Sequence, residues 1–235
     1  MNKDLILSLK DRILIISPHP DDETLSSGGI IQKAIKLKIP IKILIMTNGE
    51  NFKLTFKLDS PLRKPTKNNI NEFGKKRQNE AIAALHILGV NKKDIIFLSL
   101  PDKGIKSIYL ANTNIEMLQN FIPTKIFYPS DIDKHPDHRF TSLIVKKVFA
   151  NNLNTERYAY LLHYKWWPMF QNLKRKNYIS PPLALLKNKT WVNVTLSKDE
   201  EAIKKKALMQ YVTQRRLIFL YFNSIAKNNE LFIKE

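Results

Sequence analysis

The sequence predicts an α/β protein with a Rossmann-like, doubly wound and mostly parallel sheet that carries helices on both faces. Two observations predict this fold. Short apolar runs recur along the chain, and segments with helical periodicity separate them. Apolar runs without polar alternation are typical of strands buried on both faces, as in parallel sheets. Strands that alternate with helices indicate βαβ units wound around one sheet.

The individual elements follow from these patterns. The expected strands are the apolar runs at residues 12–17, 41–47, 94–100, 125–130, 157–164 and 190–196. The expected helices cover residues 24–38, 71–88, 112–122, 135–150 and 197–222. Ser197 is a favourable N-cap for the last helix, because its hydroxyl can accept a hydrogen bond from the first turn. Gly28 and Gly29 lie inside a predicted helix, where glycine is unfavourable, so we expect a neighbouring element to approach the backbone there.

The length of the chain favours one large domain. At 235 residues it can bury a sizeable core, and we expect a single domain over residues 1–235 with a C-terminal loop-and-helix extension from about residue 165. Residues 165–191 are rich in proline, aromatic residues and lysine and have weak periodicity. We therefore expect them to form a long loop over one end of the sheet.

Composition excludes several classes of protein. The chain has no cysteine, which excludes disulfides, thiolate metal sites and a cysteine nucleophile. It has no apolar run long enough for a signal peptide or a membrane span, so we expect a cytoplasmic protein. The motifs GxGxxG and GxSxG are absent, which argues against a dinucleotide site and a serine hydrolase.

The formal net charge is +18, from 39 basic and 21 acidic residues. A positive surface attracts anions, such as an acidic substrate or an anionic membrane, although scattered lysines also arise from composition or serve solubility. The basic residues do not gather with aromatic residues, so no specific nucleic-acid partner is expected. The oligomeric state stays open.

Polar segments follow four of the predicted strands. They read SPHPDDE, NGE, PDKG and SDIDKHPDH and begin at residues 17, 48, 101 and 130. Ligands of open parallel sheets bind beyond the carboxyl ends of the strands. We therefore expect these four segments to meet at one rim.

The three consecutive acids at residues 21–23 need a positive partner, because adjacent carboxylates repel one another. A helix N-terminus, a basic patch or a metal ion would serve. A plain helix cap explains neither His19 nor the second His-Pro-Asp, which begins at His135. His135 and His138 are three residues apart at the start of a predicted helix and share one face. Histidine, carboxylate and histidine are ligands that suit zinc with one open position.

Several segments resemble the LmbE/PIG-L family of metal-dependent N-acetylglucosaminyl de-N-acetylases. They read PHPDDE, HPDH, RQNEAIAALHILGV, LPDKGI and KKALMQYVTQ, and they extend from Arg12 to about Gln214. The paired HPDD and HPDH motifs are the specific part of the resemblance. It implies a Rossmann-like fold with a zinc ion at the strand ends. The implied activity is hydrolysis of the acetyl group from an N-acetylated amino sugar in a larger small-molecule conjugate.

The resemblance also implies roles for individual residues. His19, Asp22 and His138 would hold one Zn²⁺ per chain, and another divalent metal is the alternative. Asp21 would be the general base, and His135 would stabilise the oxyanion or assist the departing amine. These roles match what amide hydrolysis requires, because an amide is a poor electrophile with a poor leaving group.

Some family members carry a tyrosine where this chain has Asp133. Tyr128 or Tyr164 would then have to supply the phenol. Alternatively, Asp133 orients His135 and raises the pKa of that imidazole.

Four residues are tentative substrate contacts: Arg77, Asp102, His163 and Trp166. Arg77 is otherwise an ordinary helix charge, and Asp102 is otherwise a turn acid. The segment HYKWWP at 163–168 is expected to form a wall of the substrate cleft, and the alternative is that its tryptophans fill the core under a long loop.

Two other functions stay open. One is a different metal-assisted hydrolase that cleaves another amide or a phosphoester. The other is a non-catalytic protein that binds a metal or an anion. The aglycone of the sugar conjugate is not predictable from these residues.

Overall fold

The computed structural model describes residues 3–61, 64–111, 121–165, 167–169 and 177–235. These residues form an eight-stranded sheet in the order β1-β7-β8-β6-β5-β2-β3-β4. The strands are β1 (Lys3–Asp4), β2 (Ile13–Ser17), β3 (Ile41–Thr47), β4 (Ile95–Leu100), β5 (Lys125–Pro129), β6 (Glu156–Tyr160), β7 (Thr190–Thr195) and β8 (Asn229–Lys234).

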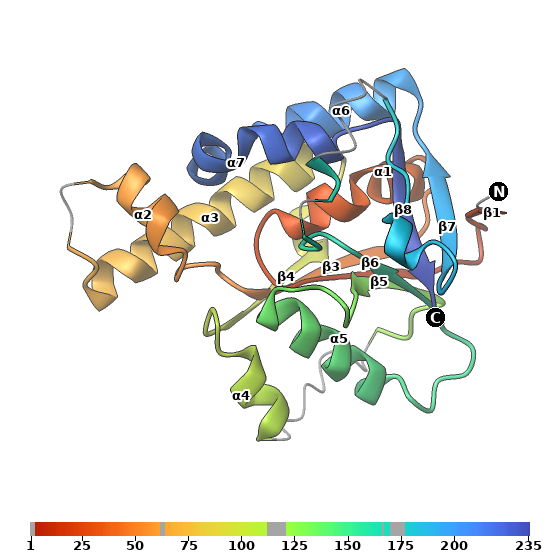
Figure 1. Ribbon diagram of the computed structural model, residues 1–235, viewed down its shortest axis with the longest axis horizontal. Coiled ribbons are helices and arrows are strands. Elements are labelled where there is room, and N and C mark those ends of the chain that lie inside the picture. The colour runs from red at the N-terminus through yellow and green to blue at the C-terminus, as the bar shows by residue number, and fades with distance from the viewer. Residues whose placement is uncertain (1–2, 62–63, 112–120, 166, 170–176) are drawn as a thin grey trace.

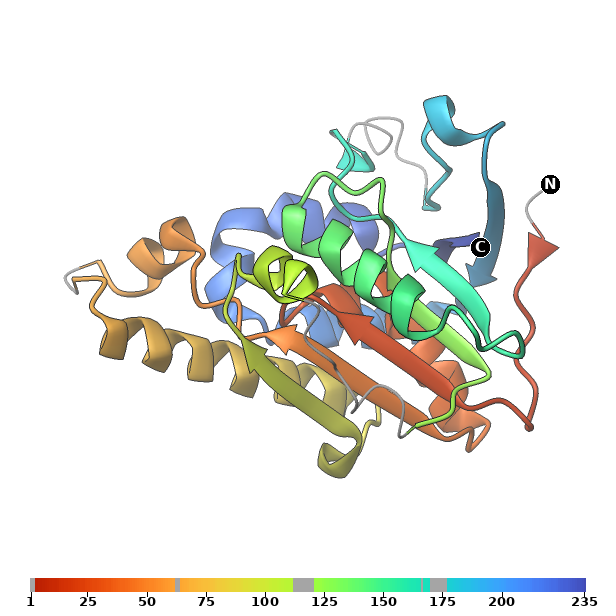
Figure 2. The same cartoon turned by 90° about the horizontal axis from the view of Figure 1, so that it is seen from below.

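Helices cover both faces of this sheet. They are α1 (Asp22–Lys36), α2 (Lys53–Asp59), α3 (Lys67–Ile87), α4 (Ile105–Leu110), α5 (Pro136–Val148), α6 (Lys198–Leu208) and α7 (Val212–Ile225). In Figure 1, α1, α3, α6 and α7 lie above the sheet and α4 and α5 lie below it, and Figure 2 shows the second group from its own side. Among the described helices, none combines the length and the apolar character needed to cross a membrane.

The sheet is mostly parallel. Strand β2 lies in the middle of the parallel block β6-β5-β2-β3-β4. It pairs in parallel with β3 and β5, and β4 and β6 continue the parallel ladder on either side. Strand β8 is antiparallel to both β6 and β7. All five residues of β2 are buried, as are those of β5, because helices cover the central strands on both sides.

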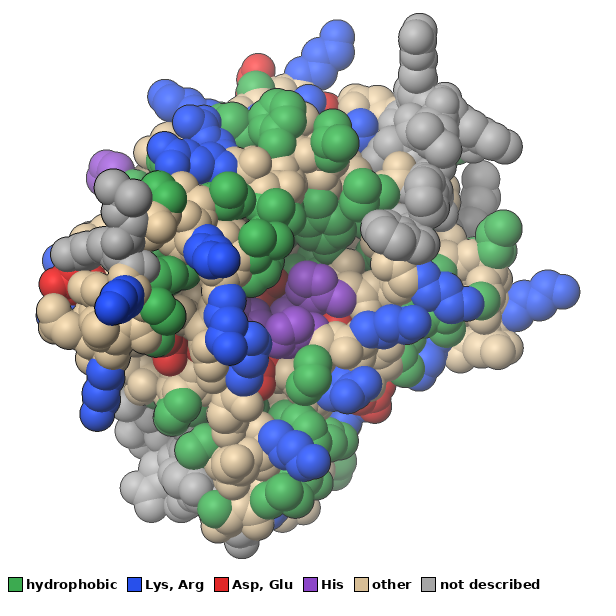
Figure 3. Space-filling view, turned by 60° about the vertical axis from the view of Figure 1, so that its left-hand side comes forward, with side chains coloured by type: hydrophobic (Ala, Val, Ile, Leu, Met, Phe, Trp, Pro, Cys, Tyr) green, Lys and Arg blue, Asp and Glu red, His purple; other side chains and the backbone are tan. Residues whose placement is uncertain are grey.

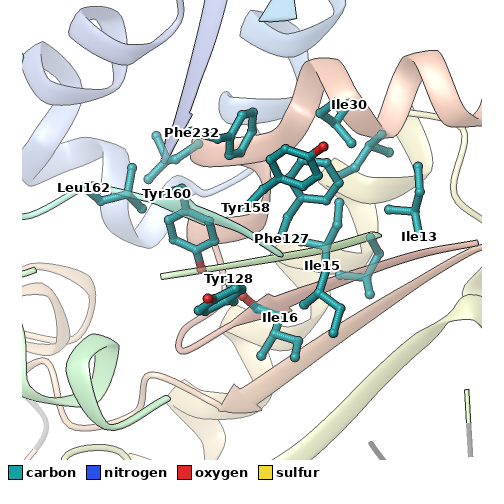
Figure 4. Packing of buried hydrophobic residues seen from close by; sticks show 14 of the residues in the cluster. Ile13, Ile15, Ile16, Ile30, Phe127, Tyr128, Tyr158, Tyr160, Leu162 and Phe232 are labelled. Carbon is teal, nitrogen blue, oxygen red and sulfur yellow. Dashed lines mark hydrogen bonds between the residues drawn. The ribbon is translucent and has the colours of Figure 1, made fainter. Parts of the chain in front are cut away.

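The core lies between the central strands and the helices. Figure 4 shows isoleucines of β2 beside aromatic side chains of β5 and β6. The Phe127 ring stacks on that of Tyr158 with centroids 5.2 Å apart, and it meets Phe232 of β8 edge to face. The last strand is therefore packed into the same core as the first parallel strands.

The two adjacent glycines of α1 allow another helix to approach closely, as expected. A Cβ added to Gly29 would lie 2.7 Å from Cδ1 of Leu196, and one added to Gly28 would lie 3.1 Å from Cγ of Lys204. A larger residue would force Leu196, which precedes α6, or Lys204 of α6 to shift.

The structure corrects one predicted element. The expected helix 197–222 is two helices, α6 and α7, which a break at residues 209–211 separates. The break places the Tyr211 hydroxyl against Glu23, at 2.5 Å, and lets Glu80 accept hydrogen bonds from the backbone N–H and hydroxyl of Thr213. Ser197 caps α6 and forms a capping box with Glu200, as its position predicts.

Other differences are smaller. Strands β1 and β8 and helices α2 and α4 were not predicted, and most of the expected helix 112–122 lies outside the described residues. The remaining strands and helices have the predicted type, and their ends shift by a few residues.

Candidate functional site

The polar segments that follow β2, β3, β4 and β5 meet at the carboxyl ends of these strands. The segments after β2, β4 and β5 line a pocket of about 610 Å³ together with residues from the loop after β6 and from α7. The segment after β3 lies against this lining, since Gly49 accepts a hydrogen bond from Arg77 and Glu50 accepts one from the backbone N–H of Asp102. Figure 3 shows the histidine side chains in a hollow on this side of the molecule, with hydrophobic side chains and Lys and Arg side chains around it. The predicted convergence on one rim is confirmed by this placement.

The turn between β2 and α1 directs its three acids to different places. Asp21 occupies the N-cap position with a φ of 126°, and its side chain makes no capping hydrogen bond. Asp22 turns towards the histidines. Glu23 points inward and accepts hydrogen bonds from the hydroxyls of Ser17 and Tyr211. These three acids therefore do not act simply as caps of α1.

Asp22 joins two histidines from different segments. Its Oδ2 lies 3.1 Å from Nδ1 of His19 and 3.1 Å from Nε2 of His138. His138 is fully buried, and its Nε2 has no hydrogen bond of acceptable geometry among the described residues. An imidazole nitrogen without such a bond, next to a carboxylate oxygen and a second imidazole, is the arrangement expected of residues that share a cation.

Three more carboxylates contact the far sides of these histidines. Nε2 of His19 lies 3.3 Å from Asp102 and 3.3 Å from Asp137. Nδ1 of His138 lies 3.2 Å from Oδ2 of Asp133. Carboxylates in these positions orient imidazole ligands and select their tautomers.

The described residues offer three overlapping sets of metal-ligating side chains. These are His19, His135 and His138; Asp22, His138 and His163; and His19, Asp102 and Asp137. In the third set, Asp102 also accepts a hydrogen bond from the backbone N–H of Asn51, and Asp137 accepts one from Lys103. Both carboxylates are thus already held by backbone donors.

The two adjacent aspartates have opposite pKa shifts. Burial raises the pKa of Asp21 to about 8, although Arg77 acts against this. Burial also acts to raise the pKa of Asp22, but His138 and His19 outweigh it and hold this pKa well below its usual value. The same residue type therefore carries a proton near neutral pH at one position and a full charge at the next.

The histidines divide in the same way. Burial lowers the pKa of His135 to about 4, and the charges of His19 and His138 add to this effect. Burial acts to lower the pKa of His138 too, but Asp22 and Asp133 raise it to about 9. The pKa of His19 is raised as well, because its carboxylate partners outweigh its burial.

Arg77 lies beside Asp21 rather than in open solvent. Its guanidinium donates to the backbone oxygens of Gly49 and Pro20 and to Oδ2 of Asp21, at 2.6, 2.8 and 3.2 Å. A Cβ on Gly49 would lie 1.8 Å from Nη1 of Arg77, and Gly49 has a φ of +61°. Glycine is therefore required there so that Arg77 can reach the turn that carries Asp21.

The remaining sequence-predicted residues are placed as follows. His135 lines the pocket at the start of α5, and His163 lines it after β6. Asp102 lines it too, but its side chain is almost wholly buried against His19. Trp166 lies outside the described residues. Its neighbour Trp167 lines the pocket, and its indole N–H donates to the Ser180 oxygen at 2.8 Å.

The predicted role of Asp133 is wrong in one respect. Asp133 accepts a hydrogen bond from the backbone N–H of His135, not from its ring, and the imidazole that it contacts is His138. The pKa of His135 is lowered rather than raised. Tyr128 does not supply a phenol either, since its hydroxyl donates to Glu235 at 2.7 Å.

Sequence reasoning missed Tyr221 and the role of Asp137. Tyr221 of α7 lines the pocket and stacks on His163, and no sequence signal distinguishes it from other aromatic residues of that helix. Asp137 belongs to the HPDH motif, so its position inside the second His-Pro-Asp was a usable signal.

Comparison with known proteins identifies relatives. The family model described as PIG-L, GlcNAc-PI de-N-acetylase, matches residues 14–149. A Bacillus subtilis (strain 168) protein named "Probable N-acetyl-alpha-D-glucosaminyl L-malate deacetylase 2" is 31% identical over 135 residues. That match covers 55% of this chain and 57% of the relative, so the chain spans little more than half of the relative's length.

Solved structures share the fold. The A40926 pseudoaglycone deacetylase Dbv21 superposes with a TM-score of 0.68 at 20% identity, with 96% of this chain and 97% of that chain covered. GalB, the 4-carboxy-2-hydroxymuconate hydratase of Pseudomonas putida KT2440, has a TM-score of 0.54 at 14% identity, with 91% and 83% covered. The fold therefore occurs with more than one chemistry, and the reaction has to be argued from the site.

Proposed function

The chain belongs to the PIG-L family of GlcNAc-PI de-N-acetylases, and on that premise we propose that it hydrolyses the acetamide of an N-acetylglucosaminyl conjugate. One observation carries the proposal: His19, Asp21, Asp22, His135 and His138 come from two separate His-Pro-Asp segments and meet in one pocket or directly beneath it. The deacetylase named among its relatives supports the same reaction class.

The donor set fits a divalent metal held by His19, Asp22 and His138, with zinc as the preferred ion. The three side chains are buried, and the ring nitrogens of both histidines lie close to one Asp22 oxygen. Two imidazoles and one carboxylate are typical of catalytic zinc sites that keep a position open. When bound, such an ion polarises an amide carbonyl and lowers the pKa of water.

Asp133, Asp102 and Asp137 would act as positioning residues for this site. Asp133 faces Nδ1 of His138, which leaves Nε2 free to face Asp22. Asp102 and Asp137 do the same for His19, since they face its Nε2 while Nδ1 faces Asp22. Each carboxylate would thereby fix the orientation of the histidine ring that it contacts.

Asp21 suits the role of general base. It lines the pocket, and its pKa of about 8 lies near neutral pH, where a carboxyl group can both accept and return a proton. We propose that Asp21 takes a proton from the attacking water and delivers it to the departing amine. Arg77 holds the carboxylate in place, so we assign Arg77 to positioning rather than to substrate binding.

His135 suits stabilisation of the oxyanion. It lines the pocket, and its pKa of about 4 keeps the ring neutral at physiological pH. A neutral imidazole can donate one N–H to the developing oxyanion, and one such donor contributes on the order of 3 kcal/mol to the transition state. Because of the same low pKa, His135 is not protonated near pH 7 and cannot serve as a general acid. We therefore assign protonation of the departing amine to Asp21.

Other pocket residues suit recognition of the conjugate. His163 and Trp167 line the pocket as part of the segment that was expected to form its wall, and Lys103, Lys134 and Lys165 also line it. The three lysines favour a conjugate with an anionic group. The strand order supports a doubly wound, Rossmann-like fold in a single domain, because the parallel strands are added from β2 to β3 and β4 on one side and to β5 and β6 on the other.

The test is release of a free amine and of acetate from a panel of N-acetylglucosaminyl conjugates, by protein whose metal content has been measured. We expect amine and acetate in equal amounts. Asp21→Asn should retain its metal and lose about 10²–10⁴ in rate, whereas Asp199→Asn, an exposed aspartate in the first turn of α6, should behave as wild type. Full activity of Asp21→Asn would refute the assignment of the base. Release of phosphate instead of acetate would favour phosphoester hydrolysis.

A further inference from the structure

Two short stretches beside the pocket expose apolar and basic side chains together. Of the fifteen large hydrophobic side chains that are exposed in the described part of the chain, five lie on α2 and α7. They are Leu54, Leu58, Leu217, Phe219 and Leu220, with exposed fractions of 51, 43, 37, 48 and 72%. An isolated exposed leucine is ordinary, but a gathering of this kind marks an interaction surface.

The two helices form one continuous surface. Helix α2 packs against α7, and the Arg216 guanidinium donates to the backbone oxygen of Leu58 at 3.4 Å. Leu54 and Leu58 are four residues apart and share a face of α2. Figure 1 places both helices at the same end of the molecule, and the space-filling view of that end shows hydrophobic and basic side chains side by side.

The charge of this surface has one sign. Lys53 and Lys57 are exposed beside the two leucines of α2, and α7 carries Arg215 and Arg216. Helix α7 has no acidic residue, and Asp59, the one acid of α2, forms an ion pair with Lys76. Apolar side chains surrounded by lysine and arginine are typical of helices that lie on anionic lipid.

We propose that the outer faces of α2 and α7, with Leu54, Leu58, Lys53, Lys57 and Leu220 as their main contacts, are a docking surface for an anionic membrane. The alternative of a second copy of this chain is disfavoured, because a two-fold contact would oppose lysines and arginines to one another. An anionic lipid surface offers charge of the opposite sign together with an apolar layer that can receive the leucines.

The surface borders the mouth of the pocket. Phe52 immediately precedes α2 and lines the pocket, and so do Ile218 and Tyr221 on the inner side of α7. A membrane bound to the outer faces of the two helices would therefore lie beside the entrance to the proposed active site. This docking does not depend on the reaction, because none of its main contacts lines the pocket.

The experiment is co-sedimentation of the full chain with vesicles of phosphatidylcholine alone and of phosphatidylcholine mixed with phosphatidylglycerol. We expect binding to the mixed vesicles that weakens when salt is raised to about 0.5 M, where charges are screened over a few ångströms. Lys53→Glu/Lys57→Glu should reduce partitioning by about twentyfold or more, since each cation contributes about fivefold. Leu54→Ser/Leu58→Ser should reduce it about tenfold.

Matched controls separate this surface from the general charge of the protein. Lys92→Glu/Lys187→Glu changes the net charge equally, and Leu153→Ser/Leu183→Ser removes two leucines that are 93 and 87% exposed. Lys92 precedes β4, Leu153 precedes β6, and Leu183 and Lys187 precede β7, so none of the four lies on α2 or α7, and none lines the pocket. The controls should bind as wild type.

Several outcomes would overturn the proposal. One is that the protein does not bind the mixed vesicles, or binds neutral vesicles equally well. Another is that the control variants lose as much binding as the α2 variants. A third is that vesicle binding is absent and light scattering shows a dimer that Leu54→Ser/Leu58→Ser abolishes. Amine release from a water-soluble conjugate should be unchanged in the α2 variants. A failure of docking is thereby distinguished from a failure of the proposed reaction.

Discussion

Replacement of Lys204 by methionine should destabilise the fold strongly, although Lys204 touches no pocket residue of the proposed mechanism. Its ammonium donates to Oε1 of Glu230 at 2.6 Å, and both side chains are about 1% exposed. Glu230 also accepts the backbone N–H groups of Gly29 and Ile30, at 2.6 and 3.1 Å. This one carboxylate thus connects β8, α6 and the middle of α1.

The magnitude follows from what the substitution leaves behind. Methionine keeps the aliphatic stem that packs on Gly28 but leaves a buried carboxylate with two backbone donors. Loss of one partner of a buried ion pair reduces the free energy of unfolding by about 3–5 kcal/mol. We expect a value near 3 kcal/mol, because two backbone N–H groups still donate to the carboxylate. At about 2 °C per kcal/mol for a chain of this size, the melting temperature should fall by roughly 6 °C or more.

Lys205 of the same helix provides the control. It pairs with Glu201 four residues earlier, but its side chain is 47% exposed, so Lys205→Met should cost only a few tenths of a kcal/mol. Urea denaturation and thermal melting of both variants measure the difference. If Lys204→Met costs no more than Lys205→Met, the buried pair does not stabilise the contact between β8 and α1.

Two further predictions concern the proposed metal site. Asp133→Asn should weaken metal binding about 10–100-fold in a chelator competition, because asparagine lacks the negative charge that faces Nδ1 of His138 at 3.2 Å and orients this ring; Asp131→Asn is the nearby control, and equal affinities would contradict the positioning role. Apparent metal affinity should also rise with pH up to about 9, because His138, whose pKa is about 9 without a metal, is protonated below that value and must lose its proton to bind. An affinity that is constant between about pH 6 and 9 would contradict this prediction.

The parallel part of the sheet was predictable because its strands are buried on both faces and therefore read as plain apolar runs. Strand β8 was not, since it begins with Asn229, a residue type common in turns, and Glu230, a residue type depleted in strands. Tertiary partners override that preference: Lys204 neutralises Glu230, and Asn229 pairs with the backbone of Ile179. No local pattern contains this information.

The break between α6 and α7 has a similar cause. The sequence has neither glycine nor proline at residues 209–211, so local propensity predicts one helix. The structure ends α6 because Tyr211 is buried against Glu23 and because Glu80 satisfies the first turn of α7. Both partners are more than a hundred residues away in the chain.

The residue types of the site were predictable, whereas the environment of each residue was not. The two His-Pro-Asp motifs indicated which side chains meet, because their distance from the strand ends places them on one rim. The carboxylate that contacts each ring depends on side-chain directions at α5 and on the loop after β4. For that reason Asp133 was associated with His135, although it contacts the ring of His138.

The proposed roles of the site residues depend on two pairs of identical residue types whose surroundings differ. Asp21 and Asp22 are neighbours in the chain, yet only Asp22 lies against two imidazoles, while burial raises the pKa of Asp21. His135 and His138 share one face of α5, yet only His138 lies between two carboxylates. A ligand is held by opposite charge, a general base must exchange a proton near pH 7, and a neutral donor must stay uncharged at that pH. The residues with charged partners therefore suit the metal, and Asp21 and His135 suit the chemistry of the substrate.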